Sequence, residues 1–189
     1  MDDSFTVTVK HKPVLDPGFL PAILWNQAFR QRVASTSAGV ALAIALERRD
    51  GTVSRTDTHI LPATSENEPL NRLYVERLVK FLLWQKGGHT IYVGGSPCIG
   101  KMLAAIYSAD GERAFDFDLM GRQMYGQTMR VLSCSLEEVP RANEIAKTLG
   151  RNLDGCRIGF DLGGSDRKCA ALIDGKVVHS EEVEWSPYF

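Results

Sequence analysis

The run Asp161-Leu162-Gly163-Gly164-Ser165 places a carboxylate, two glycines and a hydroxyl next to one another. It lies between the apolar runs CRIGF and KCAALI, so we expect it at the tip of a β-hairpin. Glycines let a backbone approach phosphate oxygens closely, and consecutive N–H groups in a turn can bind an anion. A neighbouring carboxylate can hold Mg²⁺ directly or through water. The run therefore predicts a phosphate and metal site, and a plain hairpin without a ligand is the alternative.

A second glycine pair, Gly94-Gly95, lies between the apolar run TIYV and a helix expected to begin at Ser96 and Pro97. The free N–H groups and the dipole of a helix N-terminus favour an anion there. The alternative is a βα turn in which glycine serves only close packing. The segment GSPCIGK is not a P-loop, because no serine or threonine follows its lysine.

The sequence around Asp161 resembles a known family. The segment RIGFDLGGSDRKCAALIDGKVV is similar to the N-terminal signature of the ROK family of bacterial sugar kinases and sugar-responsive repressors, within the actin-like ATPase superfamily. The resemblance covers about the last 35 residues. It implies that Asp161 takes the metal-associated position, that Gly163 and Gly164 are the close-approach glycines, and that Ser165 stands where the family usually has threonine.

The same resemblance extends to Gly94 and Gly95, which look like the adenosine-side motif of the superfamily. Two features depart from the family pattern: Asp166 replaces a lysine, and the turn is one residue longer before Lys168. A carboxylate at this position would repel a γ-phosphate. A family kinase also needs an aspartate general base, a second phosphate motif and usually a Cys-x-Cys zinc loop, and none of these occurs in the sequence.

Hydrophobic periodicity and turn residues predict an α/β protein. The expected elements of residues 1–150 are, in order, a helix over 20–34, two strands over 39–61 joined at Asp50-Gly51, a helix from Pro69 to Gly87, a strand over 90–95, a helix from Ser96, a strand over 128–134 and a helix over 140–150. After the first helix this order is ββαβαβα, which suggests a degenerate ribonuclease-H-like unit of unknown role.

The apolar periodicity of two helices predicts which side chains face the core. For the helix over 20–34 these are Leu20, Ile23, Leu24, Phe29 and Val33, and for the helix from Pro69 they are Leu70, Leu73, Tyr74, Leu78, Phe81 and Leu82. On the second helix, Glu76 and Lys80 are expected to form an exposed i, i+4 pair.

Residues 151–189 read as a three-stranded antiparallel meander that opens an actin-like ATPase domain. Such a meander bears apolar residues, among them Ile158 and Phe160, and three strands alone are only marginally stable. We therefore expect a homodimer, or docking of the meander on a missing C-terminal part. On this interpretation the chain is the front part of a longer protein.

Composition limits the remaining possibilities. The 189 residues are 44% hydrophobic and 24% charged with a net charge of −1, so nucleic acid is not an expected partner. No apolar run approaches the ~18 residues of a membrane span, and MDDSFTVTVKHK lacks the order of a signal peptide. We expect a cytoplasmic protein with cysteines that are small buried hydrophobes, with packed tryptophans, and without a structural metal.

These observations predict a ROK-like sugar kinase homologue, of which this chain is the N-terminal portion. In the full-length protein, ATP and Mg²⁺ would bind and a phosphoryl group would pass to a sugar hydroxyl. We expect no cofactor and no turnover for this chain alone, because it lacks the base and the second phosphate motif. The alternative is a non-enzymatic module that keeps the actin-like fold and binds a sugar or a protein.

Overall fold

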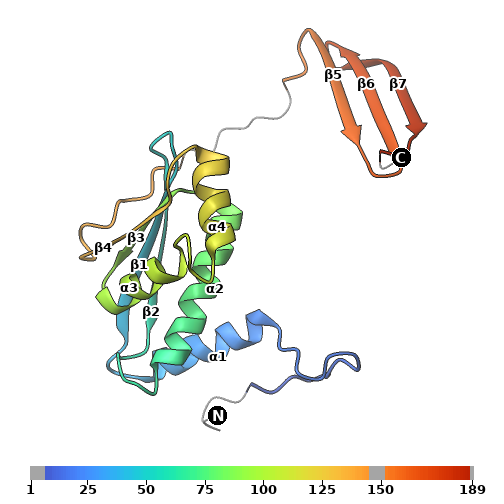
Figure 1. Cartoon of the computed structure of the whole chain (residues 1–189). Helices are drawn as coiled ribbons and strands as arrows, with labels where there is room; N and C mark the ends of the chain where they lie inside the picture. Colours follow the sequence, from blue (N-terminus) through green and yellow to red (C-terminus); the bar gives the residue numbers. More distant parts are fainter. Residues whose placement is uncertain (1–6, 145–151, 188–189) are drawn as a thin grey trace. The chain divides into compact units, whose positions relative to one another are not determined.

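The computed structural model describes residues 7–144 and 152–187 and divides the chain into two compact units, Met1–Glu144 and Ile145–Phe189 (Figure 1). The fold is mixed α/β, as the sequence predicts. The first unit has a four-stranded mixed sheet with four helices, and the second has a three-stranded antiparallel sheet. Within the described ranges, no helix combines the length and the apolar character needed to cross a membrane.

The sheet of the first unit has the strand order β2-β1-β3-β4. Strands β1 (Val40–Glu47) and β2 (Val53–Ile60) form the predicted hairpin, and Gly51 at its tip has a φ of 78°, which favours glycine. Strand β3 (Thr90–Gly94) pairs antiparallel with β1 and parallel with β4 (Arg130–Cys134). A parallel pair needs a crossover connection, which the helices between β3 and β4 supply.

Helices cover one face of this sheet. They are α1 (Ala22–Ser35), α2 (Glu68–Lys86), α3 (Pro97–Ile106) and α4 (Ala114–Asp118), and a single turn of π-helix, η1 (Leu119–Gln123), follows α4. The core between helices and sheet is one apolar cluster that includes Trp25, Phe29, Leu42, Ile44, Leu46, Tyr74, Leu83, Ile91, Val93 and Leu103.

The buried faces of α1 and α2 are rotated from the ones that the sequence predicts. Of the face predicted for α1, Phe29 and Val33 are buried as expected but Ile23 is 58% exposed, and Trp25, which lies outside that face, is buried. In α2, Phe81 was expected in the core but is 59% exposed. Four-residue spacing places side chains almost one above another along a helix. In α1 the core position is therefore taken by Trp25, Phe29 and Val33, which follow one another at intervals of four.

The expected surface pair between Glu76 and Lys80 of α2 does not form. Glu76 pairs with Arg113 instead, and Lys80 pairs with Asp116, which is 2% exposed. The Asp116 carboxylate also accepts a hydrogen bond of 2.7 Å from Trp84 Nε1. The partners of Glu76 and Lys80 therefore lie in α4 or just before it, and these polar contacts hold α4 against α2.

An irregular segment, residues 135–144, covers the other face of the sheet. Val139 from this segment is 2% exposed and packs against Ala43, Ala45 and Val53. Large side chains would not fit between the segment and β1, so the alanines of β1 suit this face and its larger aliphatic residues suit the helix face. Both faces of the central strand are thus buried.

The helix predicted from Pro140 is wrong for the part that the structure describes, because residues 140–144 are not helical; the rest of that prediction falls on residues outside the described ranges. The backbone N–H of Asn143 donates to Val53 O (3.1 Å), and Val53 N–H donates to Asn143 Oδ1 (2.6 Å). These bonds to the edge of β2 replace the ones that a helix would make.

The second unit is the predicted meander of β5 (Cys156–Leu162), β6 (Asp166–Ile173) and β7 (Lys176–Glu184). The β6–β7 turn consists of Asp174 and Gly175, with φ of 49° and 78°, as a two-residue hairpin requires. The other connection is the run Gly163–Ser165. All three strands and both turns therefore follow the sequence prediction.

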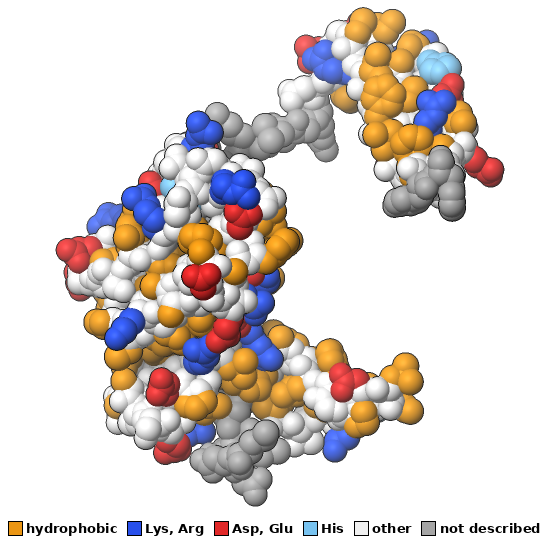
Figure 2. Space-filling model, in the orientation of Figure 1, with side chains coloured by type: hydrophobic (Ala, Val, Ile, Leu, Met, Phe, Trp, Pro, Cys, Tyr) orange, Lys and Arg blue, Asp and Glu red, His pale blue; other side chains and the backbone are white. Residues whose placement is uncertain are grey.

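The apolar residues of β5 remain exposed within this unit. Ile158, Phe160 and Leu162 alternate along the strand and so share one face of the sheet, where they are 68%, 70% and 65% exposed. Figure 2 shows hydrophobic side chains gathered over the visible face of the meander. No helix of the described residues 152–187 covers either face.

The cysteines are less buried than expected. Cys98 and Cys156 are exposed, Cys134 and Cys169 are partly buried, and all four are free thiols. Cys98 lies in the first turn of α3, and Cys156 begins the edge strand β5, where a side chain has few neighbours. Cysteine is small enough that these positions need no core environment.

The tryptophans divide in a similar way. Trp25 is buried as expected, whereas Trp84 is 53% exposed and Trp185 is 36% exposed, so core packing is wrong for these two. Each of these indoles instead donates a hydrogen bond, Trp84 to Asp116 Oδ1 and Trp185 to Gly163 O.

Candidate functional site

The turn after β5 holds the candidate metal and phosphate residues. Gly163 N–H donates to Asp166 O (2.9 Å) and closes the turn. Trp185, just after β7, reaches across to it: its Nε1 donates to Gly163 O (2.9 Å), and its backbone N–H donates to Ser165 O (3.0 Å). Trp185 therefore fixes the carbonyl groups of Gly163 and Ser165, and the space beside Gly164, between them, stays open.

The glycines of this turn do not adopt the backbone geometry on which the phosphate prediction depends. Neither Gly163 nor Gly164 has a positive φ, so neither position requires the left-handed conformation that favours glycine. A Cβ atom on Gly163 would lie 3.0 Å from both the backbone O and the Oδ1 of Asp166, whereas one on Gly164 would meet nothing within 4 Å. Glycine at 163 is explained by this close approach, and the turn shows no alternation of handedness of the kind that forms an anion nest.

Charged side chains form a row across one face of the meander. The strand register places Asp161 beside Lys168, and Lys168 beside Glu182. Lys168 Nζ lies 3.4 Å from Asp166 Oδ1 and 3.6 Å from Glu182 Oε1. The hydrogen bond that Lys168 donates to Asp166, together with the charges of both carboxylates, raises the pKa of Lys168. The one lysine of this row is therefore already engaged by acidic partners.

Small residues leave a hollow of about 510 Å³ beside Asp161. Gly159, Ala170 and Ser180 are aligned across the three strands by the register and line the hollow together with Asp161. Because none of the three has a large side chain, the Asp161 carboxylate borders open space. Within the described part of the chain it is neither hydrogen-bonded nor ion-paired.

These residues fit Mg²⁺ better than they fit a phosphate group. A protein usually binds Mg²⁺ through one or two carboxylates, with water and substrate phosphates as the other ligands, so Asp161 alone is a suitable donor. Over residues 7–144 and 152–187, no cluster of three or more metal-binding side chains occurs. Asp166 borders the turn where a phosphate would approach, and its charge opposes such an anion. The turn as it stands therefore offers a metal ligand without a phosphate cradle.

The Gly94-Gly95 turn has the predicted form of strand, glycine pair and helix. Gly95 has a φ of 96°, and Ser96 caps α3 by accepting a hydrogen bond from Ile99 N–H (3.5 Å). A Cβ on Gly94 would lie 2.3 Å from Val139 Cγ2, and a Cβ on Gly95 would lie 2.2 Å from Ala41 O. Protein atoms thus fill the space beside both glycines, which supports the packing alternative for this pair.

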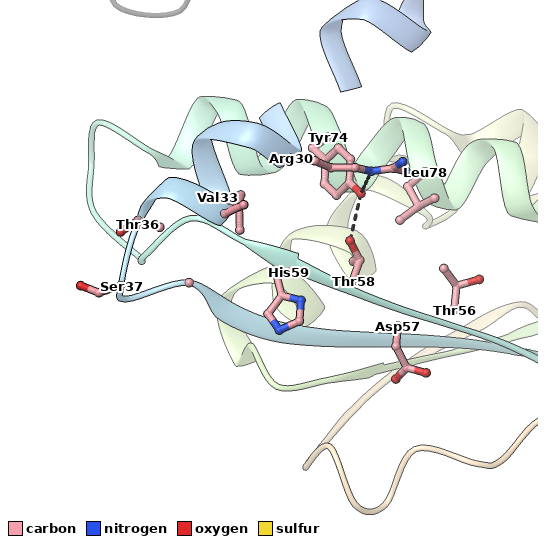
Figure 3. A pocket seen from close by; sticks show the side chains of 12 residues that line it. Arg30, Val33, Thr36, Ser37, Thr56, Asp57, Thr58, His59, Tyr74 and Leu78 are labelled. Atoms are coloured by element: carbon pink, nitrogen blue, oxygen red, sulfur yellow. Dashed lines mark hydrogen bonds between the residues drawn. The ribbon is translucent and has the colours of Figure 1, made fainter. Parts of the chain in front are cut away.

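Another cavity, of about 690 Å³, is bordered by α1, β2 and α2 (Figure 3), and no sequence motif marks the residues that line it. Arg30, Thr58 and Tyr74 meet there through hydrogen bonds. They come from three elements, and the helical pattern predicts only that Tyr74 faces the core. No local spacing connects these positions, so the sequence held no signal for their contact.

Comparisons of the chain with protein-family models, with curated proteins and with solved structures found no match.

Proposed function

We propose that the chain supplies the nucleotide-side metal ligand of a ROK-like sugar kinase homologue. The observation that carries this proposal is the free Asp161 carboxylate, which borders an open hollow near the end of β5 and precedes a glycine turn. In the proposed full-length protein, bound Mg²⁺ would neutralise charge on the phosphates of ATP during transfer to a sugar hydroxyl. The first unit, with its mixed sheet, would be the degenerate ribonuclease-H-like part.

Within this proposal the roles of the chain's own residues are limited. Asp161 would orient the metal, and Trp185 would hold the turn in shape through Gly163 and Ser165. No residue is assigned to remove the proton of a sugar hydroxyl. Transfer needs a positioned base as well as a phosphate clamp, so this chain alone would not turn over.

A specific observation favours a second function, a non-enzymatic module that binds a sugar or a protein. Lys168, which the register places beside Asp161, is held between Asp166 and Glu182 and is therefore not available for a phosphate. The turn glycines also lack the left-handed conformation of an anion nest. A fold that kept the hairpin but lost phosphate binding would have these features.

The two functions differ in how the turn responds to nucleotide. The chain alone is not expected to retain ATP as a bound cofactor, so the test uses millimolar MgATP, at which a weak contact still shifts amide signals. In the isotope-labelled chain, the kinase proposal expects such shifts to be confined to residues 161–166, to vanish in Asp161→Asn and to persist in Glu184→Gln, a charge control on the same sheet. Shifts absent from the wild type, or unchanged in Asp161→Asn, would reject the nucleotide role and leave the module. Incubation with ATP and hexoses or N-acetylhexosamines should yield no sugar phosphate; turnover abolished by Asp161→Ala would contradict that expectation.

A further inference from the structure

The hydrogen-bond pattern of β2 shows which of its backbone groups point away from the sheet. Arg48 N–H donates to Thr52 O (2.9 Å), which marks these two as a hydrogen-bonded pair at the hairpin end. Such pairs alternate along an antiparallel ladder, so the even-numbered residues of β2 bond to β1 and the odd-numbered ones face outward. Val53 fits this pattern, because both its N–H and its C=O bond to Asn143 on the outer side.

The chain covers only one end of this outer edge. Asn143 occupies the outward groups of Val53, and the Arg55 side chain donates from Nη1 to Val139 O (2.8 Å). The next outward residues are Asp57 and His59. Their backbone groups have no partner among the described residues, so this stretch of the edge strand is open.

The cavity shown in Figure 3 runs along this open stretch. Residues 56–59 form one side of it, and the last turns of α1 and part of α2 form the other. Its apolar lining comes from Val33 and Leu78, and hydroxyl groups from Thr36, Ser37 and Thr56 contribute polar atoms. An edge strand with an adjoining groove can accept an extended peptide, with main-chain bonds along the edge and a side chain in the groove.

Arg30 is held in a fixed position at this groove. Its Nε donates to the hydroxyl of Tyr74 (3.1 Å), which also shares a hydrogen bond with Thr58 Oγ1 (2.9 Å). Tyr74 is 1% exposed and its ring stacks on Phe29, so it is a rigid support. The terminal nitrogens of Arg30 have no carboxylate partner within the described ranges. These two nitrogens carry four N–H groups, which are available to a group that enters the groove.

The charge of the groove favours an acidic occupant. Asp57 is the one carboxylate that lines it. Its Oδ1 accepts a hydrogen bond of 2.8 Å from Arg55 Nη2, and Arg55 Nε lies 3.1 Å from the same oxygen. The negative charge of Asp57 is thus paired with Arg55 of the same strand. Arg30 is left as the charged residue of the lining that has no ion-pair partner among the described residues.

From this arrangement we propose that the open edge of β2 at Asp57 and His59 binds an extended acidic peptide segment of a partner protein, with a carboxylate side chain of that segment on Arg30. A small anion would use only the N–H donors and would leave the carbonyl groups unpaired. An extended main chain satisfies both at alternate residues, which is why a peptide fits the edge better. This proposal is independent of any nucleotide role for the second unit.

A phage-displayed library of random decapeptides, selected on the intact chain, tests the proposal. We expect enrichment of peptides with Asp or Glu at a fixed position within a β-compatible sequence. The synthetic consensus peptide should bind Arg30→Gln at least tenfold more weakly than the wild type. Arg49→Gln, at the exposed hairpin tip, is the matched control and should keep wild-type affinity. Failure to enrich acidic peptides, or equal affinity for Arg30→Gln, would overturn the proposal.

The backbone contribution is tested separately. His59→Pro removes an outward N–H without taking a bond from β1, so the edge strand tolerates it, and peptide binding should fall, whereas His59→Ala should bind normally. The same peptide, N-methylated at alternate residues, should not bind the wild-type chain. This tests the main-chain hydrogen bonds without any change to the protein. Any one of three results would reject strand addition by a partner peptide. These are undiminished binding of the methylated peptide, displacement of the unmodified peptide by inorganic phosphate, and a dimer that His59→Pro dissociates.

Discussion

The two glycines of the β5–β6 turn differ in the space around them, and this difference gives a prediction at the scale of single residues. A methyl group at 163 would press on the backbone of Asp166, while one at 164 would meet open space. Gly163→Ala should destabilise the meander by about 1 kcal/mol through crowding. Gly164→Ala should leave stability unchanged or raise it slightly, because it restricts the unfolded chain. Native-state hydrogen exchange of residues 156–184 measures both, and equal effects would contradict the geometry.

Glu144 gives a pH-dependent prediction. Its Oε1 accepts a hydrogen bond from Ser54 Oγ (2.7 Å), and this bond, with Lys86 and Arg48 nearby, lowers its pKa below the usual 4.5. A lowered carboxyl pKa adds stability above the unfolded value, and that stability is lost as pH falls through the folded value. Glu144→Gln should therefore be less stable than the wild type at pH 7, and the difference should vanish in acid.

Urea unfolding between pH 7 and pH 2.5 checks this expectation. Glu137→Gln, at an exposed position of the same segment, is the control and should follow the wild-type curve throughout. A difference between Glu144→Gln and the wild type that stays constant with pH would show that the carboxylate charge at 144 has no part in stability.

At the scale of elements, α4 depends on one buried carboxylate. Asp116 accepts hydrogen bonds from Lys80 and Trp84 of α2. Removing it leaves two donors without their charged acceptor, so Asp116→Ala should cost about 2–3 kcal/mol. Asp118→Ala, on the same short helix, breaks only exposed contacts, an ion pair with Arg122 and a hydrogen bond from Gln123, and should cause little change. Thermal unfolding of both variants measures these effects. Similar losses of stability in the two variants would show that helix propensity, and not the buried carboxylate, determines the stability of α4.

Local signals explain which elements the sequence predicted well. The segment from β3 to α3 was predictable because Ser96 and Pro97 mark a helix start within a few residues of an apolar strand. The helix expected from Pro140 failed because Asn143 bonds to Val53, far away in the sequence. The Glu76–Lys80 pair failed for the same reason, since both side chains found partners outside α2. Periodicity describes one element at a time and carries no information on such contacts.

The candidate sites divide in the same way. The position of Asp161 at the end of a strand followed from the flanking apolar runs and the glycine turn. The contact of Lys168 with Glu182 depends on the register between β6 and β7, which the sequence does not display. The groove beside Arg30 could not be predicted from the sequence, because it forms only where three elements, α1, β2 and α2, meet.

At the scale of the whole molecule, the exposed apolar residues of β5 predict association. Ile158, Phe160 and Leu162 share one face, and covering an exposed phenylalanine side chain is worth about 1.5–3 kcal/mol. We expect a homodimer at micromolar concentration that Phe160→Glu dissociates. Ser180→Glu, aligned with Gly159 on the opposite face, should leave it intact. Light scattering with limited proteolysis measures this, and a monomer that rapidly loses its last 35 or so residues would contradict self-association.

The irregular segment after β4 determines how the first unit can be produced in isolation. A fragment that stopped at Cys134 would contain every helix and strand of that unit and would look complete by its secondary structure. It would nevertheless lose Val139 from the back of β1 and Asn143 from the edge of β2, exposing Ala43, Ala45 and the backbone of Val53. We expect this fragment to aggregate, because a bare sheet face and an open edge invite pairing between chains. A fragment that extends through Glu144 should stay monodisperse by gel filtration, and equal behaviour of the two fragments would refute this role of the segment.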